Sequence, residues 1–357
     1  MALELKNVTK KVGSETHIYD TSVKLQENGF NILLGTTLSG KTTLMQLMAG
    51  IDHPTTGEVW FNGKNVTGTS VQKRNLSMVY QQFINYPNFS VYDNIASPLR
   101  VKRVGSAEIK KRVGEIAELL KLTPYLKRYP AELSGGQQQR TALARALIKE
   151  ADLILLDEPL ANLDFKLREE LRDELPKLFA NKPCTVVYAT TEPSEALLLA
   201  GHTATLHEGS ITQFGETSTL YRKPADLITA KVFSDPPINA ATVKVSGEDI
   251  ILNGTAKWKN ITATEPLPDG EYTMGIRPHH ITPSSGENNG NQITGQVLIT
   301  ELSGSESVIH FDVQGLTWVS QFHGIKAYNL GDNAPFNIDT SKCLYFDSNG
   351  KFVTSGR

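Results

Sequence analysis

Up to about residue 230, the chain alternates short apolar runs with longer segments of helical periodicity. Residues 30–34 form one apolar run, which stops at Gly35, and residues 152–156 and 184–188 form two more. The segment after Gly35 has apolar residues at the i, i+3, i+4 and i+7 spacing of a helix, at Leu44, Leu47, Met48 and Ile51. Strands that are each followed by a helix predict an α/β fold, with a parallel sheet wrapped by helices.

One stretch within this part has a composition typical of helices. Residues 107–147 contain many Lys, Arg, Glu, Leu and Ala and few β-branched residues, which gives them a high helix propensity. We therefore expect a helical subdomain at about residues 90–150.

The pattern changes near residue 233. Residues 234–237, with the sequence SDPP, interrupt the helical periodicity, and short Val, Ile, Thr and Tyr runs separated by Gly, Asn, Asp and Pro follow. Such runs are typical of an all-β domain. We predict an α/β domain over residues 1–233 and a β-rich domain over 234–357, with a flexible loop at 284–291.

The charge balance and the apolar runs exclude several classes of protein. The 357 residues include 36 Lys and Arg and 38 Asp and Glu, a net charge of −2, so no basic excess indicates a nucleic-acid partner. The richest apolar runs fall far short of the roughly 18 residues of a transmembrane helix. Cys184 and Cys343 are the only cysteines, and the N-terminus lacks the pattern of a secretion signal. We therefore expect a cytosolic compartment.

A phosphate-binding motif follows the first apolar run. Residues 35–42, GTTLSGKT, match G-x-x-x-x-G-K-[ST] between a predicted strand and a predicted helix. Lys41 is expected to pair with the β- and γ-phosphates, and the Thr42 hydroxyl to bind Mg²⁺. The alternative, a chance glycine turn, is disfavoured by the flanking strand and helix. The predicted nucleotide-binding residues are Gly35, Thr36, Thr37, Leu38, Ser39, Gly40, Lys41, Thr42 and Thr43.

Two acidic residues end the apolar run at 153–156. A carboxylate at the carboxyl end of a parallel strand lies where open α/β sheets bind ligands. Asp157 is thus placed to hold Mg²⁺ through water, and Glu158 to polarise a water in line with the γ-phosphate. Alone, such a pair is more often a helix cap, but the phosphate motif upstream favours the catalytic interpretation.

A second candidate anion site lies at the start of a predicted helix. Ser134, Gly135, Gly136 and Gln137 combine a hydroxyl with exposed glycine amides, an arrangement suited to a γ-phosphate. The alternative is a simple N-cap, for which one serine would suffice. Two glycines would only weaken a helix start, so they favour a functional role.

These motifs occur together, and in this order, in one family. The segment LSGGQQQR at 133–140 is similar to the signature sequence of ATP-binding-cassette (ABC) ATPases and lies between a P-loop and an LILLDEP segment. Gln81 resembles the Q-loop glutamine, and Asp164 resembles the D-loop aspartate. The segment GIRPHH at 275–280 is similar to the GIRPEH element of the oligomer-binding-fold (TOBE) regulatory domain of maltose and glycerol-3-phosphate importer ATPases.

The resemblance covers essentially the whole chain and implies an ABC ATPase domain followed by a TOBE domain. It implies that Gln81 senses Mg²⁺ and acts with Glu158 in catalysis, and that the flank of the Q-loop contacts a transmembrane subunit. In the family, two ATPase subunits sandwich two ATP molecules, each P-loop facing the signature of the other chain. Residues 36–39 and 81–87 are most similar to alphaproteobacterial glycerol or glycerol-phosphate importers, in which two different ATPase subunits serve one importer.

Three positions depart from the family pattern. Leu38 replaces a P-loop glycine, and we expect a right-handed alternative there, because a left-handed backbone would strain a leucine by about 1 kcal/mol or more. Val12 stands near the position of the aromatic that stacks on adenine, so Tyr19 or His17 is left as a substitute, or as a partly buried strand residue. Thr191 stands where the family's switch histidine contacts the γ-phosphate, and it is shorter and uncharged.

The expected function is that of an ATP-binding subunit that couples hydrolysis to import of a sugar, polyol or glycerol phosphate. Its expected ligands are ATP and Mg²⁺. Its expected partners are a second ATPase subunit, in a homo- or heterodimer, two transmembrane permease subunits and, indirectly, a periplasmic substrate-binding protein. It would lie at the cytoplasmic face of the bacterial inner membrane. The alternatives are a regulatory subunit that hardly hydrolyses ATP and a soluble ABC ATPase outside transport.

Overall fold

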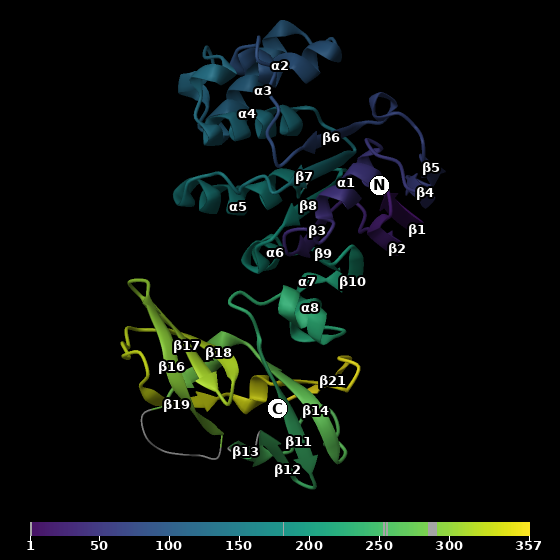
Figure 1. Ribbon diagram of the computed structural model, residues 1–357. Helices are drawn as coiled ribbons and strands as arrows, with labels where there is room; N and C mark the ends of the chain where they lie inside the picture. The colour runs from purple at the N-terminus through teal and green to yellow at the C-terminus, as the bar shows by residue number, and fades with distance from the viewer. Residues whose placement is uncertain (1, 181, 253, 255, 285–290) are drawn as a thin grey trace. The chain divides into compact units, whose positions relative to one another are not determined.

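The computed structural model describes residues 2–180, 182–252, 254, 256–284 and 291–357. The chain divides into two compact units, unit 1 over residues 1–218 and unit 2 over residues 219–357 (Figure 1). Most of the predicted flexible loop, residues 285–290, lies outside the described residues.

A six-stranded sheet forms the centre of unit 1. Its strands lie in the order β10-β9-β3-β8-β7-β6, and all neighbouring strands are parallel except β9 and β10. The strands are β3 (Phe30–Gly35), β6 (Leu76–Val79), β7 (Leu153–Asp157), β8 (Thr185–Thr190), β9 (His202–His207) and β10 (Ser210–Glu216). Every residue of β3, β7 and β8 is buried, as continuous apolar runs in a sheet covered on both faces require. The predicted parallel sheet is confirmed.

A smaller antiparallel sheet shares a hydrophobic core with α1 (Lys41–Ala49) and the larger sheet. Its order is β2-β1-β4-β5, with β1 (Leu3–Val12), β2 (Glu15–Lys24), β4 (Thr56–Phe61) and β5 (Lys64–Asn65). The buried residues of β1, Leu3, Leu5 and Val8, pack into that core. This packing fixes the sheet beside the loop that precedes α1.

Three helices lie together at one end of unit 1 (Figure 1). They are α2 (Val91–Val101), α3 (Ser106–Leu119) and α4 (Gly135–Ile148). The Ser90 side chain caps α2 by accepting a hydrogen bond from the Asp93 amide. Two further helices, α5 (Phe165–Phe179) and α6 (Pro193–Leu199), follow β7 and β8.

Unit 2 consists mainly of two antiparallel sheets, as the β-rich pattern predicts. One has the order β13-β12-β11-β14-β20-β21 and the other β15-β19-β16-β17-β18. Apolar residues from both sheets, among them Met274, Phe311, Trp318 and Phe336, form one buried core. The strands are β11 (Asn239–Ser246), β12 (Asp249–Leu252), β13 (Ala256–Lys259), β14 (Gly270–Ile276), β15 (Ile281–Pro283), β16 (Gln292–Leu302), β17 (Glu306–Val313), β18 (Leu316–His323), β19 (Asn333–Ile338), β20 (Leu344–Phe346) and β21 (Phe352–Ser355).

The division between the compact units lies at 218/219, earlier than the boundary predicted at 233/234. The helix α7 (Thr217–Arg222) spans the division, and α8 (Leu227–Val232) belongs to unit 2. Ala230 of α8 packs in a cluster with Ile238, Leu344 and Phe346. The backbone amide of Leu227 also donates to the carbonyl of Gly350. The sequence signal at 234–237 marks the end of α8, whereas packing assigns that helix to the β-rich unit.

Among the described residues, no helix is both long and apolar enough to cross a membrane.

Fragments that end at different residues test the division. We expect a fragment of residues 1–218 to unfold cooperatively, because its sheets have their own buried core. A fragment of residues 1–233 should unfold at a similar temperature but aggregate more, because it exposes the face of α8 that covers β20. Differential scanning calorimetry and light scattering measure the two properties. Cooperative unfolding of the longer fragment alone would return the boundary to 233.

Candidate functional site

The loop between β3 and α1 has the conformation that its glycines allow. Gly40 precedes α1 with a φ of 101°, a value that side chains rarely adopt. A Cβ atom on Gly35 would lie 2.4 Å from Ser39 Oγ and 2.6 Å from the Leu206 carbonyl oxygen. The loop therefore turns tightly and leads directly into the amino end of α1. The free backbone amides at a helix amino end bind anions favourably.

Leu38 corrects one expectation from the sequence. Its φ is +66°, so the backbone takes a left-handed conformation, which favours glycine, and not a right-handed alternative. The side chain is 95% exposed, so only its own backbone opposes the conformation, at about 1–2 kcal/mol. The glycines on either side and the packing of the loop fix this geometry at the expense of local strain.

Lys41 is held inside the loop. Its Nζ donates to the carbonyl oxygens of Gly35 at 2.9 Å and Thr36 at 3.0 Å, and it lies 3.7 Å from Glu158 Oε1. Burial lowers the pKa of the ammonium group, and the Glu158 and Asp157 carboxylates oppose that shift. The side chain is 5% exposed, which makes it a preformed positive centre for phosphate oxygens.

Four polar side chains from three segments of unit 1 meet at the carboxyl end of β7. Thr42 Oγ1 donates to Asp157 Oδ2 at 2.7 Å, and Gln81 Nε2 donates to Glu158 Oε2 at 3.1 Å. Asp157 Oδ1 is buried and has no hydrogen-bond partner among the described residues. Burial raises the pKa of Asp157, as does the Glu158 charge, while Thr42 and Lys41 lower it. Hydroxyl, carboxylate and amide oxygens, one of them unpartnered, are suitable ligands for Mg²⁺.

A cavity of about 580 Å³ adjoins this group. Tyr19 and His17 line it, and Val12 does not, so β2 supplies the aromatic side chains of this cavity. The Tyr19 amide donates to the Gly209 carbonyl, and the Gly209 amide donates to the Ser39 carbonyl, each at 3.0 Å. The lining residues are Glu15, Thr16, His17, Tyr19, Thr37, Leu38, Ser39, Gly40, Lys41, Thr42, Thr43, Gln81, Glu158, Glu208 and Gly209.

Sequence reasoning missed Glu15, Thr16, Glu208 and Gly209. The last two lie in the turn between β9 and β10, more than a hundred residues from the P-loop in the sequence. A Cβ atom on Gly209, whose φ is +77°, would lie 2.4 Å from the His17 carbonyl oxygen. That close backbone approach is invisible in a single sequence, where a glycine in a hairpin is ordinary.

The signature residues lie outside this cavity. Ser134 caps α4: its hydroxyl accepts from the Gln137 amide at 3.4 Å, and Gln137 Oε1 accepts from the Ser134 amide at 3.0 Å. The N-cap interpretation of Ser134 thus holds in the isolated chain. A Cβ atom on Gly136 would lie 3.1 Å from the Asn162 carbonyl oxygen, so a side chain there would require that carbonyl to move by a few tenths of an ångström.

Asp164 and Thr191 begin the helices that follow β7 and β8. Asp164 Oδ1 accepts a hydrogen bond from the Leu167 amide at 3.0 Å and so caps α5. Thr191 is exposed, precedes α6, and does not line the cavity. Its neighbours are firmly held: Thr190 Oγ1 donates to Glu195 Oε2 at 2.6 Å and accepts from the Glu192 amide at 3.0 Å.

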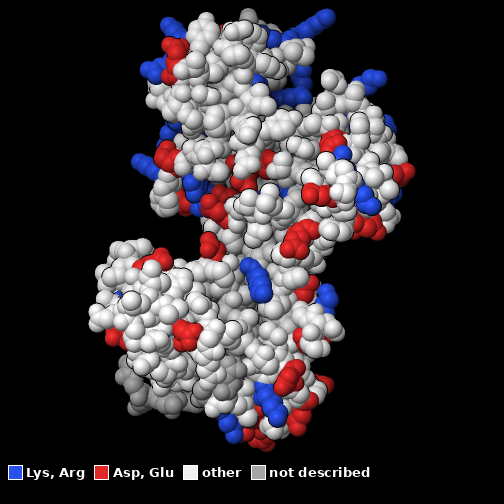
Figure 2. Space-filling view, viewed as in Figure 1, with Lys and Arg blue, Asp and Glu red and all other residues white. Residues whose placement is uncertain are grey.

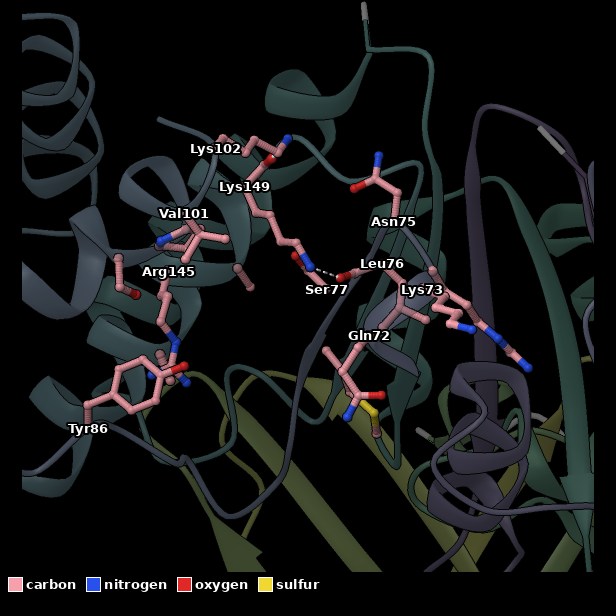
Figure 3. A pocket seen from close by; sticks show the side chains of 16 residues that line it. Gln72, Lys73, Asn75, Leu76, Ser77, Tyr86, Val101, Lys102, Arg145 and Lys149 are labelled. Atoms are coloured by element: carbon pink, nitrogen blue, oxygen red, sulfur yellow. Dashed lines mark hydrogen bonds between the residues drawn. The ribbon is translucent and has the colours of Figure 1, made fainter. Parts of the chain in front are cut away.

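A second cavity, of about 600 Å³, lies between the helices α2 and α4 and the edge strand β6 (Figure 3). The Arg145 guanidinium lies 4.6 Å from the centre of the Tyr86 ring, and Lys149 donates to the Leu76 carbonyl. Its described lining holds five basic residues and no acidic one. The lining residues are Gln72, Lys73, Arg74, Asn75, Leu76, Ser77, Met78, Tyr86, Ser97, Pro98, Val101, Lys102, Ala142, Arg145, Ala146 and Lys149.

The fold and the loop geometry define a P-loop ATPase. The family model described as ABC transporter matches residues 18–161. Two relatives match nearly the whole chain. One is the trehalose/maltose import ATP-binding protein MalK of Thermococcus litoralis, which is 34% identical over 98% of this chain and 99% of its own. The other is the sn-glycerol-3-phosphate import ATP-binding protein UgpC of Pectobacterium atrosepticum, which is 33% identical over 97% of each chain.

A solved structure matches part of the chain. It is a dimeric structure of the ATP-binding cassette MJ0796 in a post-hydrolysis state, bound to ADP and Pi. It is 30% identical, with a TM-score of 0.56, and covers 60% of this chain and 98% of its own. The chain belongs to the ABC transporter family and is one of its ATP-binding proteins. The predicted family, the ABC ATPase fold and the TOBE-like β domain are confirmed.

Substitution of Leu38 tests the strain in the loop. We expect Leu38→Gly to raise the free energy of unfolding by about 0.5–1 kcal/mol, because a strain of about 1–2 kcal/mol is removed while glycine adds some entropy to the unfolded chain. Leu38→Ala removes the same exposed side chain but keeps the strain, so it should leave the value unchanged. Urea denaturation measures both. An equal gain from both variants would locate the effect in the side chain instead.

Substitution of Tyr19 tests the base-binding end of the cavity. We expect Tyr19→Ala to weaken ATP binding about tenfold or more, because stacking on an aromatic ring contributes about 1–3 kcal/mol per base. Val12→Ala should have no effect, and neither variant should alter binding of tripolyphosphate, which has no base. Calorimetric titration provides the affinities. If His17→Ala weakens ATP binding and Tyr19→Ala does not, His17 is the residue that contacts the base.

Proposed function

We propose that this chain couples ATP binding and hydrolysis to the import of a sugar, polyol or glycerol phosphate through an ABC transporter. The P-loop cavity carries the proposal, because Lys41, Thr42 and Glu158 line it and the buried Asp157 accepts a hydrogen bond from Thr42. Relatives that match over 97% or more of this chain are named as import ATP-binding proteins. Those names do not favour an ABC ATPase outside transport. The proposed location is the cytoplasmic face of the bacterial inner membrane.

The chemistry follows from the side chains around the cavity. Lys41 would bind the β- and γ-phosphates by exchanging its carbonyl partners for phosphate oxygens. Thr42, Asp157 and Gln81 would hold Mg²⁺, which when bound neutralises phosphate charge. Glu158 accepts a hydrogen bond from Gln81 and faces the Lys41 ammonium, so its carboxylate is held at the cavity and can accept a proton from an attacking water.

The site in one chain is incomplete, which supports a dimer. Ser134, Gly135, Gly136 and Gln137 present a helix amino end but do not line the P-loop cavity of their own chain. A second ATPase subunit that places its signature over this P-loop would supply the missing amides to the γ-phosphate. We propose that each subunit of the dimer completes the site of the other.

Thr191 supports a dimer of two different ATPase subunits. A threonine hydroxyl cannot supply the positive charge of a histidine, and loss of one such donor to the γ-phosphate costs about 10²–10³ in rate. Leu38 and Val12 give no support for two unequal sites, because the loop has the left-handed backbone that a glycine would adopt at Leu38 and Tyr19 lines the cavity in place of Val12. We propose that this chain's own site is the weaker one and that its signature completes the stronger site on a partner.

The second cavity, which five basic residues line, supports a docking site for the permease subunits. It lies beside the flank of the Q-loop: Arg145 donates to the Ile84 carbonyl, and Asn85 Nδ2 donates to the Gln138 carbonyl at 2.8 Å. A permease segment seated there would therefore contact both the Q-loop flank and the helix that bears the signature. We propose that two permease subunits dock on two such cavities and receive solute from a periplasmic binding protein.

Two variants in the assembled transporter test the proposed roles. The transporter is purified through a tag on this chain, together with the membrane subunits and second ATPase that we expect to co-purify. Ser134→Arg, which blocks the signature over the stronger site, should reduce ATP-driven transport about 100-fold or more. Glu158→Gln should reduce it only severalfold, because it removes the base of the weaker site.

The opposite ranking would reverse the proposed asymmetry. Vigorous ATP hydrolysis by a homodimer of this chain, with no second ATPase in the preparation, would refute the heterodimer and make Thr191 a tolerated substitution. Absence of membrane subunits from the preparation would contradict the transport role itself.

A further inference from the structure

Arg168, near the start of α5, connects two segments that lie far apart in the sequence. Its Nη2 donates to the carbonyl oxygens of Ala161 and Leu163, each at 3.3 Å. Its Nη1 donates to Glu192 Oε1, also at 3.3 Å. The side chain is 25% exposed. One planar guanidinium therefore joins the loop after β7 to the residue that follows Thr191.

The loop side of this connection lies under the signature. We call residues 161–164 the D-loop. Arg168 holds the carbonyls on both sides of Asn162, and the Asn162 carbonyl oxygen packs closely on Gly136, 3.1 Å from where a Cβ atom would stand. Arg168 therefore fixes the conformation of the D-loop, and the D-loop in that conformation packs against Gly136, the second glycine of the signature.

The other side of the connection is anchored in buried charge. Glu195 is 4% exposed, and its Oε1 accepts from Arg172 Nη2 at 3.2 Å and from Arg172 Nε at 3.3 Å. Glu195 Oε2 accepts from Thr190 and, at 3.0 Å, from the Tyr188 hydroxyl. Arg172 also pairs with Glu192. We call residues 190–192 the switch segment; the hydrogen bonds and ion pairs of Glu195 and Arg172 hold it in place. Figure 2 shows acidic and basic side chains interspersed over α5.

We propose that Arg168 is a positioning residue for ATP hydrolysis. It holds the D-loop in the shape against which the signature packs, and it makes that shape depend on the switch segment through Glu192. The inference rests on the proposed function, since the signature acts only when it completes a nucleotide site. Arg168 itself lines neither cavity, so its effect reaches the nucleotide through the D-loop.

The chemistry of the side chain explains why an arginine stands here. A guanidinium offers five donors in a fixed plane and can serve two carbonyls and one carboxylate together, whereas a lysine ammonium is a single point charge. A lysine could keep the ion pair with Glu192 or hold the D-loop carbonyls, but its geometry does not match both.

The test uses the full-length chain in its native assembly. Arg168→Gln should lower the kcat for Mg-ATP about tenfold. The KM and the dissociation constant for ATP should change by less than about twofold, and the midpoint of thermal unfolding should shift by less than about 2 °C. Lys166→Gln is the matched control. It makes the same charge change two residues earlier in α5, on an exposed side chain, and it should leave kcat unchanged.

Two further variants keep the outcome decisive. Arg168→Lys retains the charge and should fold as the wild type does, yet still lose severalfold in kcat. Glu192→Gln should also lower kcat, and the double variant Arg168→Gln/Glu192→Gln should be no slower than Arg168→Gln alone, because both break one connection.

Three results would overturn the inference alone: an active wild type with unimpaired Arg168→Gln, an equal loss in Lys166→Gln, or effects of Arg168 and Glu192 that multiply independently. A wild-type assembly without any ATP turnover would overturn the proposed function, and this inference with it.

Discussion

Parallel pairing of the central strands is the constraint on which the site depends. Leu34 pairs with Thr190 across β3 and β8, and Asp157 pairs with Ala189 across β7 and β8. Because parallel strands present their carboxyl ends at one edge, this register places the P-loop, the acidic pair and the switch segment together. A shift of one strand by one residue would turn Asp157 to the opposite face of the sheet and separate it from Thr42.

Local sequence could predict much of this arrangement, because each part carries its own signal. The buried strands are continuous apolar runs, and the P-loop has fixed spacing, so the order of strand, loop and helix follows from the residues themselves. The position of α8 does not, since the breaker at 234–237 ends the helix but does not say which core covers it. Nor could Glu208 and Gly209 be assigned to the cavity, because their turn is joined to it by the hydrogen bonds of Gly209 with Tyr19 and Ser39, which lie far away in the sequence.

Leu38 shows how tertiary packing overrides residue preference. The P-loop must satisfy the close approach of Gly35 to Ser39 and Leu206 and the left-handed backbone at Gly40. A right-handed turn at Leu38 would redirect the intervening amides, so the chain tolerates a strain of about 1–2 kcal/mol there instead. Leu38 and Thr191 therefore differ in kind. At Leu38 the backbone keeps the loop conformation that binds phosphate, although leucine disfavours it. At Thr191 no backbone geometry can supply the positive charge that a histidine would carry.

The buried charges beside the switch segment are costly to maintain. Desolvation of Arg172 and Glu195 offsets much of their attraction, so a buried ion pair of this kind is weak evidence for stability. Tyr188 and Thr190 complete the hydrogen bonds of the Glu195 carboxylate, and a fully satisfied network of this kind specifies one arrangement of its members. An apolar replacement could fill the same space, but it would not fix the rotamer of Glu192 toward Arg168. The network is therefore better explained by the need to hold the switch segment and the D-loop in one geometry than by a contribution to folding.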